Sequence, residues 1–132
     1  MSGVDAVILI AHGSRNTLSN QEVVELANTL QSQSETSERR SQSQPLKIVP
    51  AFLEITSPTL HEAVDALVAE GHKRIQVLPY FLNSGNHVTK DIPALVNEAC
   101  TKHEGVSIKL TPHFGQHPQI PALLLSMLAG EG

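Results

Sequence analysis

The stretch VDAVILIAHGSR, residues 4–15, changes abruptly from an aliphatic run to polar residues. Residues 4–11 are almost wholly apolar, which is typical of a strand buried on both faces of a parallel sheet. The polar residues 12–15 then follow the carboxyl end of this strand, where open α/β sheets bind their ligands. Residues 4–15 therefore predict an α/β fold with a parallel sheet, and a ligand site at the carboxyl end of its first strand.

Three further aliphatic runs alternate with helical patterns along the chain. This alternation predicts a small flavodoxin-like α/β domain of three layers, with a four-stranded parallel sheet in the order 2-1-3-4. We expect the strands at residues 4–11, 47–53, 74–81 and 106–111, and the last helix at residues 118–128.

Capping residues suggest where the helices begin. Ser19 followed by Glu22 is typical of a capping box before the first helix. Ser57 with Pro58 predicts the start of the second helix, and Pro93 is expected in the first turn of the third.

The length of 132 residues indicates one α/β domain over residues 1–132, with no internal duplication. Residues 31–44 contain no apolar side chain. Such a tract is too polar to bury, so we expect a frayed helix end or a mobile loop there.

Composition limits the functional classes. The net charge of −4 argues against nucleic-acid binding, and no run approaches the roughly 20 apolar residues that a membrane span requires. A cytoplasmic protein is expected. The single cysteine, Cys100, excludes an internal disulfide and is expected to pack within a helix. No glycine-rich nucleotide fingerprint or Walker loop is present, so no tightly bound cofactor is expected.

Polar residues that can bind a metal follow each expected strand: His12, Glu54, His87 and His113. A lone histidine at a strand end is more often structural, but two imidazoles and a carboxylate from adjacent strands can bind a divalent transition metal with open coordination positions. The role of His113 stays undetermined. The other histidines are expected to be solvated on the surface, namely His61, His72, His103 and His117.

Other residues near these strand ends could contact a substrate. Arg15 and Lys90 could each bind a carboxylate, or could equally be solvated charges. Gly13 allows a tight turn and a close backbone approach. Further candidate contacts are the loop residues Ser14, Ser84, Gly85 and Asn86.

The order and spacing of several motifs resemble the CbiX and SirB family of sirohydrochlorin chelatases, relatives of the ATP-independent ferrochelatases. These motifs are residues 11–15, 52–54 with Pro58, 79–82 continuing to 85–88, 91–93 and 112–113. The resemblance implies a lyase, a sirohydrochlorin cobaltochelatase or ferrochelatase, that inserts Co²⁺, Fe²⁺ or Ni²⁺ for cobalamin or siroheme synthesis.

The resemblance also implies roles for individual residues. His12 and His87 would hold the metal ion and help to remove pyrrole protons, and Glu54 would assist. The divalent ion is then a substrate. A single domain of this type implies a homodimer whose facing domains enclose the macrocycle.

Two other functions remain open from the sequence. A phosphohistidine carrier would use His12 alone, because such carriers also place a His-Gly pair after a first strand. A non-catalytic module would bind or deliver a metal without acting on a tetrapyrrole. The sequence does not identify the physiological metal, because all three ions suit imidazole and carboxylate ligands.

Overall fold

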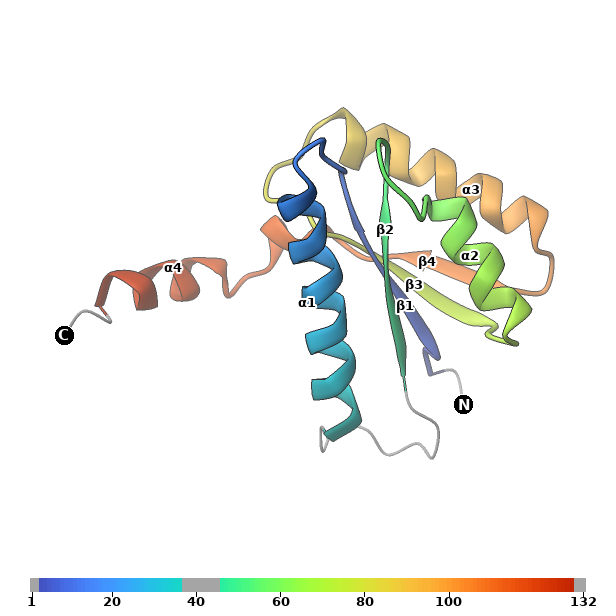
Figure 1. Cartoon of the computed structure of the whole chain (residues 1–132), viewed down its shortest axis with the longest axis horizontal. Helices are drawn as coiled ribbons and strands as arrows, with labels where there is room; N and C mark the ends of the chain where they lie inside the picture. Colours follow the sequence, from blue (N-terminus) through green and yellow to red (C-terminus); the bar gives the residue numbers. More distant parts are fainter. Residues whose placement is uncertain (1–2, 37–45, 130–132) are drawn as a thin grey trace.

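The structure is a computed structural model that describes residues 3–36 and 46–129 (Figure 1). Its strands are β1 (Ala6–Ala11), β2 (Lys47–Phe52), β3 (Arg74–Pro79) and β4 (Ser107–Leu110). Its α-helices are α1 (Thr17–Thr36), α2 (Leu60–Ala69), α3 (Ile92–Lys102) and α4 (Ile120–Ala129). A π-helical turn, η1 (His87–Asp91), precedes α3, and a 3₁₀ turn, η2 (Phe114–Gln116), precedes α4.

The four strands form one parallel sheet in the order β2-β1-β3-β4, so the predicted topology is confirmed. The central strand β1 pairs with β2 on one side and with β3 on the other, and Ile8 lies opposite both Val49 and Val77. Each observed strand lies within the predicted range and is one or two residues shorter at one or both ends. The carboxyl ends of all four strands therefore reach one edge.

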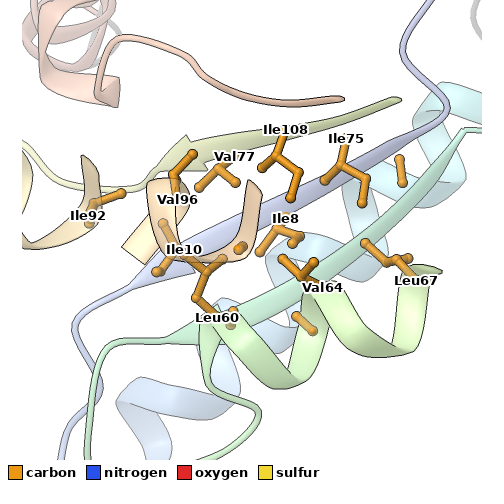
Figure 2. Close-up of a cluster of buried hydrophobic side chains, with 14 residues drawn as sticks. Ile8, Ile10, Leu60, Val64, Leu67, Ile75, Val77, Ile92, Val96 and Ile108 are labelled. Atoms are coloured by element: carbon orange, nitrogen blue, oxygen red, sulfur yellow. The ribbon is translucent and has the colours of Figure 1, made fainter. Parts of the chain in front are cut away.

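Side chains of β1 alternate between two hydrophobic clusters. On the face covered by α2 and α3, Ile8 and Ile10 pack with Leu60, Val64 and Val77 (Figure 2). On the face covered by α1, the buried cluster consists of Leu9, Ala11, Val23, Ala27 and Phe52. Burial on both faces explains why residues 6–11 are a continuous apolar run.

Helix α1 begins earlier than its sequence signal suggests. The Asn16 side chain Oδ1 accepts a hydrogen bond from the Leu18 backbone N at 3.0 Å, which caps the helix before Thr17. Ser19 lies within the first turn, so the predicted capping box from Ser19 to Glu22 is wrong.

Helix α2 has a capping box at a neighbouring position. The Thr59 hydroxyl accepts from the Glu62 backbone N at 3.2 Å, and the Glu62 carboxylate accepts from the Thr59 backbone N at 2.9 Å. The predicted cap at Ser57 is therefore wrong, because Thr59 makes both reciprocal bonds. Pro93 does occupy the first turn of α3, as predicted.

The polar tract divides at the end of α1. Residues 31–36 continue the helix, and the Gln31 side chain bonds both the Leu46 carbonyl and the Ile48 backbone N at 2.6 Å. This glutamine thus joins α1 to the start of β2. Residues 37–44, the rest of the predicted tract, lie outside the described residues.

The helices cover the sheet unequally. Helix α1 packs on β1 and β2, whereas α2 and α3 cover the opposite face. Helix α4 projects away from the domain (Figure 1). None of the helices in the described ranges is both long and apolar enough to cross a membrane.

Candidate active site at the carboxyl edge of the sheet

His12 and Glu54 are brought together by the pairing of β1 with β2. The parallel hydrogen bonds continue past both strands, because the Leu53 N donates to the Ala11 carbonyl at 2.9 Å and the Glu54 N donates to the His12 carbonyl at 3.1 Å. The imidazole Nε2 of His12 then lies 3.1 Å from the carboxylate Oε2 of Glu54. Their side chains are 45% and 56% exposed, so the pair is accessible from solvent.

Two tight turns follow this pair. Gly13 has φ +96°, and a Cβ at this position would lie 1.9 Å from the Glu54 carbonyl oxygen. Ile55 has φ +78°, which is strained for a β-branched residue, and the Thr56 N donates to the Glu54 carbonyl at 2.9 Å. Glu54 is thus held against Gly13 on one side and by a strained turn on the other.

The loop after Gly13 is fixed by Asn20 of α1. The Ser14 N donates to Asn20 Oδ1 at 2.9 Å, and Asn20 Nδ2 donates to the Ser14 carbonyl at 2.7 Å. The Ser14 hydroxyl accepts from the Asn16 N at 3.0 Å. Arg15 is exposed on this ordered loop. The sequence analysis did not identify Asn20, whose signal is only an amide near a predicted helix start.

Beside His12 is an open hollow of about 350 Å³, lined among others by Ser14, Asn20, Phe52 and Tyr80. The Tyr80 ring lies 5.7 Å from the Phe114 ring, at an interplanar angle of 48°. With Phe114, Tyr80 also lines a neighbouring hollow of about 260 Å³. This half-exposed aromatic residue was part of a family motif, but its role was not predicted.

Glu54 faces a third hollow. This space of about 310 Å³ lies between the end of β2 and the start of α3, and it is also lined by Asp91, the last residue of η1. The predicted site did not include Asp91. It brings a second carboxylate to this part of the edge.

The remaining predicted site residues lie after β3 and β4. Ser84, Gly85 and Asn86 are exposed in the loop before η1, and Lys90 is exposed within η1. His87 is the first residue of η1, but its side chain lies outside the described part of the structure. The contribution of its imidazole therefore stays a prediction.

His113 differs from His12 because it is buried. Its side chain is 6% exposed, directly before η2. Next to it, the Gly115 N donates to the Phe81 carbonyl at 2.9 Å, and a Cβ on Gly115 would lie 1.7 Å from the Leu82 carbonyl oxygen. This close approach joins the segments that follow β3 and β4.

Three of the histidines expected to be solvated pair with carboxylates instead. His61 lies 3.0 Å from Glu98 and His72 lies 3.2 Å from Asp5. His103 lies 2.7 Å from Asp65. His61 is at the surface as predicted, whereas the side chains of His72 and His103 are only 21% and 16% exposed, so they are less solvated than predicted. His117 is exposed, and its Nδ1 accepts from the Gln119 N at 3.0 Å. Cys100 packs against the larger core cluster from α3, as predicted.

The His12–Glu54 pair supplies one nitrogen and one oxygen donor that a divalent transition metal can bind. Within residues 3–36 and 46–129, and leaving out the His87 side chain, which the structure does not describe, no group of three or more His, Cys, Asp or Glu side chains is arranged to hold a metal ion. The described donors are therefore a pair at a solvent-accessible edge.

Comparisons with known proteins identify the family of the chain. The CbiX family model matches residues 6–130, so the chain belongs to the CbiX family. It is 31% identical to the chloroplastic sirohydrochlorin ferrochelatase of Arabidopsis thaliana, over 86% of this chain and 46% of the relative. It is 35% identical to the sirohydrochlorin cobaltochelatase of Methanocaldococcus jannaschii, over 76% of this chain and 64% of the relative.

Among solved structures, the CbiX protein of Marinobacter aquaeolei VT8 superimposes with a TM-score of 0.76 at 27% identity. That match covers 96% of this chain and 95% of the other. The matched segment thus spans about half to two-thirds of the two curated relatives above, but nearly the whole of the Marinobacter protein.

Proposed function

We propose that this protein inserts a divalent metal ion into sirohydrochlorin without ATP, and that the ion is Co²⁺, Fe²⁺ or Ni²⁺. Membership of the CbiX family and the names of the curated relatives support the reaction. The observation that carries the proposal for this chain is the 3.1 Å approach of His12 to Glu54 at the carboxyl edge of the sheet.

The reaction requires two ring N–H protons to leave as the metal ion enters. In the proposed mechanism His12 and His87 deliver the ion, because neutral imidazole can bind a metal and can also accept a proton. Glu54 orients the His12 ring and passes protons to solvent. The net change is one divalent ion bound and two protons released, so no nucleotide is consumed.

Several exposed groups could hold the tetrapyrrole above this pair. The Tyr80 ring lies between the hollow beside His12 and the hollow lined by Phe114, which suits a flat apolar macrocycle. Arg15 and Lys90 would bind carboxylates on the rim of the macrocycle. The loop residues Ser84, Gly85 and Asn86 would contribute polar contacts.

We also propose that two copies face each other across the macrocycle. The hollows at this edge are open rather than enclosed, and a ligand pocket usually buries most of its ligand. A second domain would provide the missing cover. Location in the cytoplasm stays a prediction from the sequence.

One anaerobic absorbance experiment tests the reaction. The purified protein is mixed with sirohydrochlorin and with Co²⁺, Fe²⁺ or Ni²⁺ in turn, against controls without protein. We expect the metal-free spectrum to convert to that of the metal complex faster with protein for at least one ion. Equal rates with and without protein for all three ions would overturn the proposal.

Two further measurements on the purified protein distinguish the two alternative functions. A metal-binding or delivery module would bind cobalt or nickel in calorimetry without accelerating the change in spectrum. A phosphohistidine carrier would take up phosphate on His12 from a phosphorylated donor protein. Neither alternative uses Glu54 as the partner of His12 in metal insertion.

A further inference from the structure

Ile55 forms a strained turn directly after Glu54. Its φ is +78°, and the Thr56 N donates to the Glu54 carbonyl at 2.9 Å. A hydrogen bond from residue i+2 back to residue i, around a central φ near +75°, defines the γ-turn of positive φ, which is rare and strained. Among the described residues, Ile55 is the only non-glycine residue with positive φ, and its branched Cβ makes this backbone more costly. The domain therefore retains a costly conformation beside the His12–Glu54 pair.

Hydrogen bonds on both sides of the turn hold this conformation in place. On one side, the Glu54 N donates to the His12 carbonyl at 3.1 Å and continues the pairing of β1 with β2. On the other side, the Phe52 N donates to the Pro58 carbonyl at 2.8 Å and closes the loop over residues 53–57. Strained residues persist where the surrounding structure fixes them in this way, and they cluster at functional sites. The turn is thus imposed by its surroundings.

Neither the backbone nor the core explains an isoleucine at this position. Glycine adopts positive φ without a steric cost, so it would form the same turn with less strain. Ile55 is 56% exposed, and it belongs to neither of the two hydrophobic clusters of the described residues. A bound state is left, in which a ligand covers the apolar side chain.

Other exposed apolar side chains lie at the same edge of the sheet. Outside α4, the described residues include five exposed large apolar side chains, and four of these lie in the segments that follow β1, β2 and β3. The four are Leu18, Ile55, Tyr80 and Leu82. Tyr80 lines the hollow beside His12, and Leu82 lines the neighbouring hollow. A ligand that lies over His12 therefore meets apolar side chains from several loops.

We propose that Ile55 is a substrate-contact residue of the metal-insertion site, and that its side chain packs against the tetrapyrrole macrocycle beside Glu54. Covering an aliphatic side chain with a flat apolar ring is favourable, and this gain offsets the strain of the turn. Because Ile55 directly follows Glu54, the contact holds the ring at the edge where Glu54 meets His12. The identity of the ligand rests on the proposed function, whereas the strained turn does not.

Matched glycine and alanine substitutions test the turn. Ile55→Gly and Ile55→Ala both remove the aliphatic side chain beyond Cβ, so their difference in stability reports on the backbone. We expect Ile55→Gly to be the more stable of the two, because glycine relieves the strain of a positive φ. At the neighbouring Thr56, whose φ is not positive, Thr56→Ala should be more stable than Thr56→Gly. Urea unfolding measures the four midpoints, and a more stable alanine variant at both positions would exclude the strained turn.

Titration with metal-free sirohydrochlorin, followed by absorbance, tests the contact. Ile55→Ala and Ile55→Gly should each raise the dissociation constant by about 10-fold, the effect expected for loss of one buried aliphatic side chain. Ile55→Leu keeps an apolar side chain of the same size and should bind more tightly than either variant. Val24→Ala is the control, because Val24 is 36% exposed on α1, and it should bind like the wild type.

Cobalt binding distinguishes a substrate contact from a displaced Glu54. In calorimetry without sirohydrochlorin, Ile55→Ala should bind cobalt with the wild-type affinity, because the His12–Glu54 pair stays in place. In the insertion assay, Ile55→Ala should raise the KM for sirohydrochlorin and leave the KM for cobalt unchanged.

Three outcomes would overturn this proposal. Wild-type affinity of Ile55→Ala for sirohydrochlorin would exclude the contact, and a weakened cobalt affinity would show that Ile55 acts by positioning Glu54. A changed molecular mass of Ile55→Ala in light scattering would assign the side chain to a contact between protein chains. Because the titration contains no metal, the contact can fail while insertion by the wild type stands. A wild type that binds sirohydrochlorin through Ile55 but inserts no metal would refute only the proposed function.

Discussion

Nε2 of His12 lies 3.1 Å from Oε2 of Glu54, where two parallel strands have just ended. The contact follows from the backbone, because the Glu54 N donates to the His12 carbonyl and Gly13 packs against the Glu54 carbonyl. Strand pairing thus sets the distance between two side chains that are far apart in the sequence. The predictions below test the parts of this arrangement.

Gly13→Ala should destabilise the domain more than Gly71→Ala. Both glycines have φ near +100°, so each alanine meets the left-handed penalty of about 1–2 kcal/mol. Only at Gly13 would the new Cβ also lie 1.9 Å from a backbone oxygen, whereas nothing lies within 4 Å at Gly71. Urea unfolding measures both free energies, and equal losses would exclude the close approach as a constraint.

Tyr80→Leu should weaken binding of metal-free sirohydrochlorin by about 2- to 10-fold, the range expected for loss of one aromatic contact. Tyr80→Phe keeps the ring and should bind like the wild type. Titration followed by absorbance, without metal, measures both dissociation constants. Identical affinities for the leucine and phenylalanine variants would show that the ring does not contact the macrocycle.

His87→Ala should lower the rate of metal insertion by about 100-fold or more, a loss typical of removing a positioned acid–base group. His72→Ala is the matched control, since it removes an imidazole at the opposite edge of the sheet, where His72 pairs with Asp5. Rates per folded molecule are compared at a fixed cobalt concentration. Equal rates for the two variants would remove His87 from the mechanism.

Asp65 should make stability depend on acid pH. Hydrogen bonds from Lys102 and then His103 hold the pKa of Asp65 below its usual value. Its contribution is therefore present above the unfolded pKa of about 3.9 and is lost as pH falls through the folded pKa. Asp65→Asn should cost no more than about 1 kcal/mol at pH 6, since the pair is largely exposed, and less near pH 2.

Urea unfolding at both pH values measures this difference, with the exposed Glu104→Gln as control. A constant cost of Asp65→Asn across the two pH values would contradict the assignment.

The fold could be predicted from the sequence because strands that are buried on both faces appear as continuous apolar runs. Residues 6–11 are apolar on both faces, and this alone indicates a central parallel strand. The first residues of the helices could not be predicted as well, because several neighbouring residues are plausible caps. These residues are Asn16, Ser19, Ser57 and Thr59. Only the observed hydrogen bonds identify Asn16 and Thr59 as the caps.

The site was predicted in part. His12 and Glu54 were expected at the same edge because parallel strands end together. A close backbone approach at Gly13 was also predicted, but its partner, the Glu54 carbonyl, was not. That partner and the positive φ of Ile55 leave no reliable signal in the sequence, since they depend on the register between β1 and β2. The exposed position of α4 was also not predicted, because the apolar sequence of residues 118–128 is equally typical of a helix that packs on the sheet.

A double-mutant cycle on the rate of cobalt insertion into sirohydrochlorin tests the central claim most directly, with His12→Ala, Glu54→Gln and the two combined. A matched cycle uses His61→Ala and Glu98→Gln, a pair of the same chemistry at 3.0 Å on α2 and α3. If His12 and Glu54 act as one unit, each single variant loses about 100-fold or more in kcat/KM, and the double variant is no worse than the poorer single one. Rates near wild type in all three variants, or losses that simply multiply, would contradict the account.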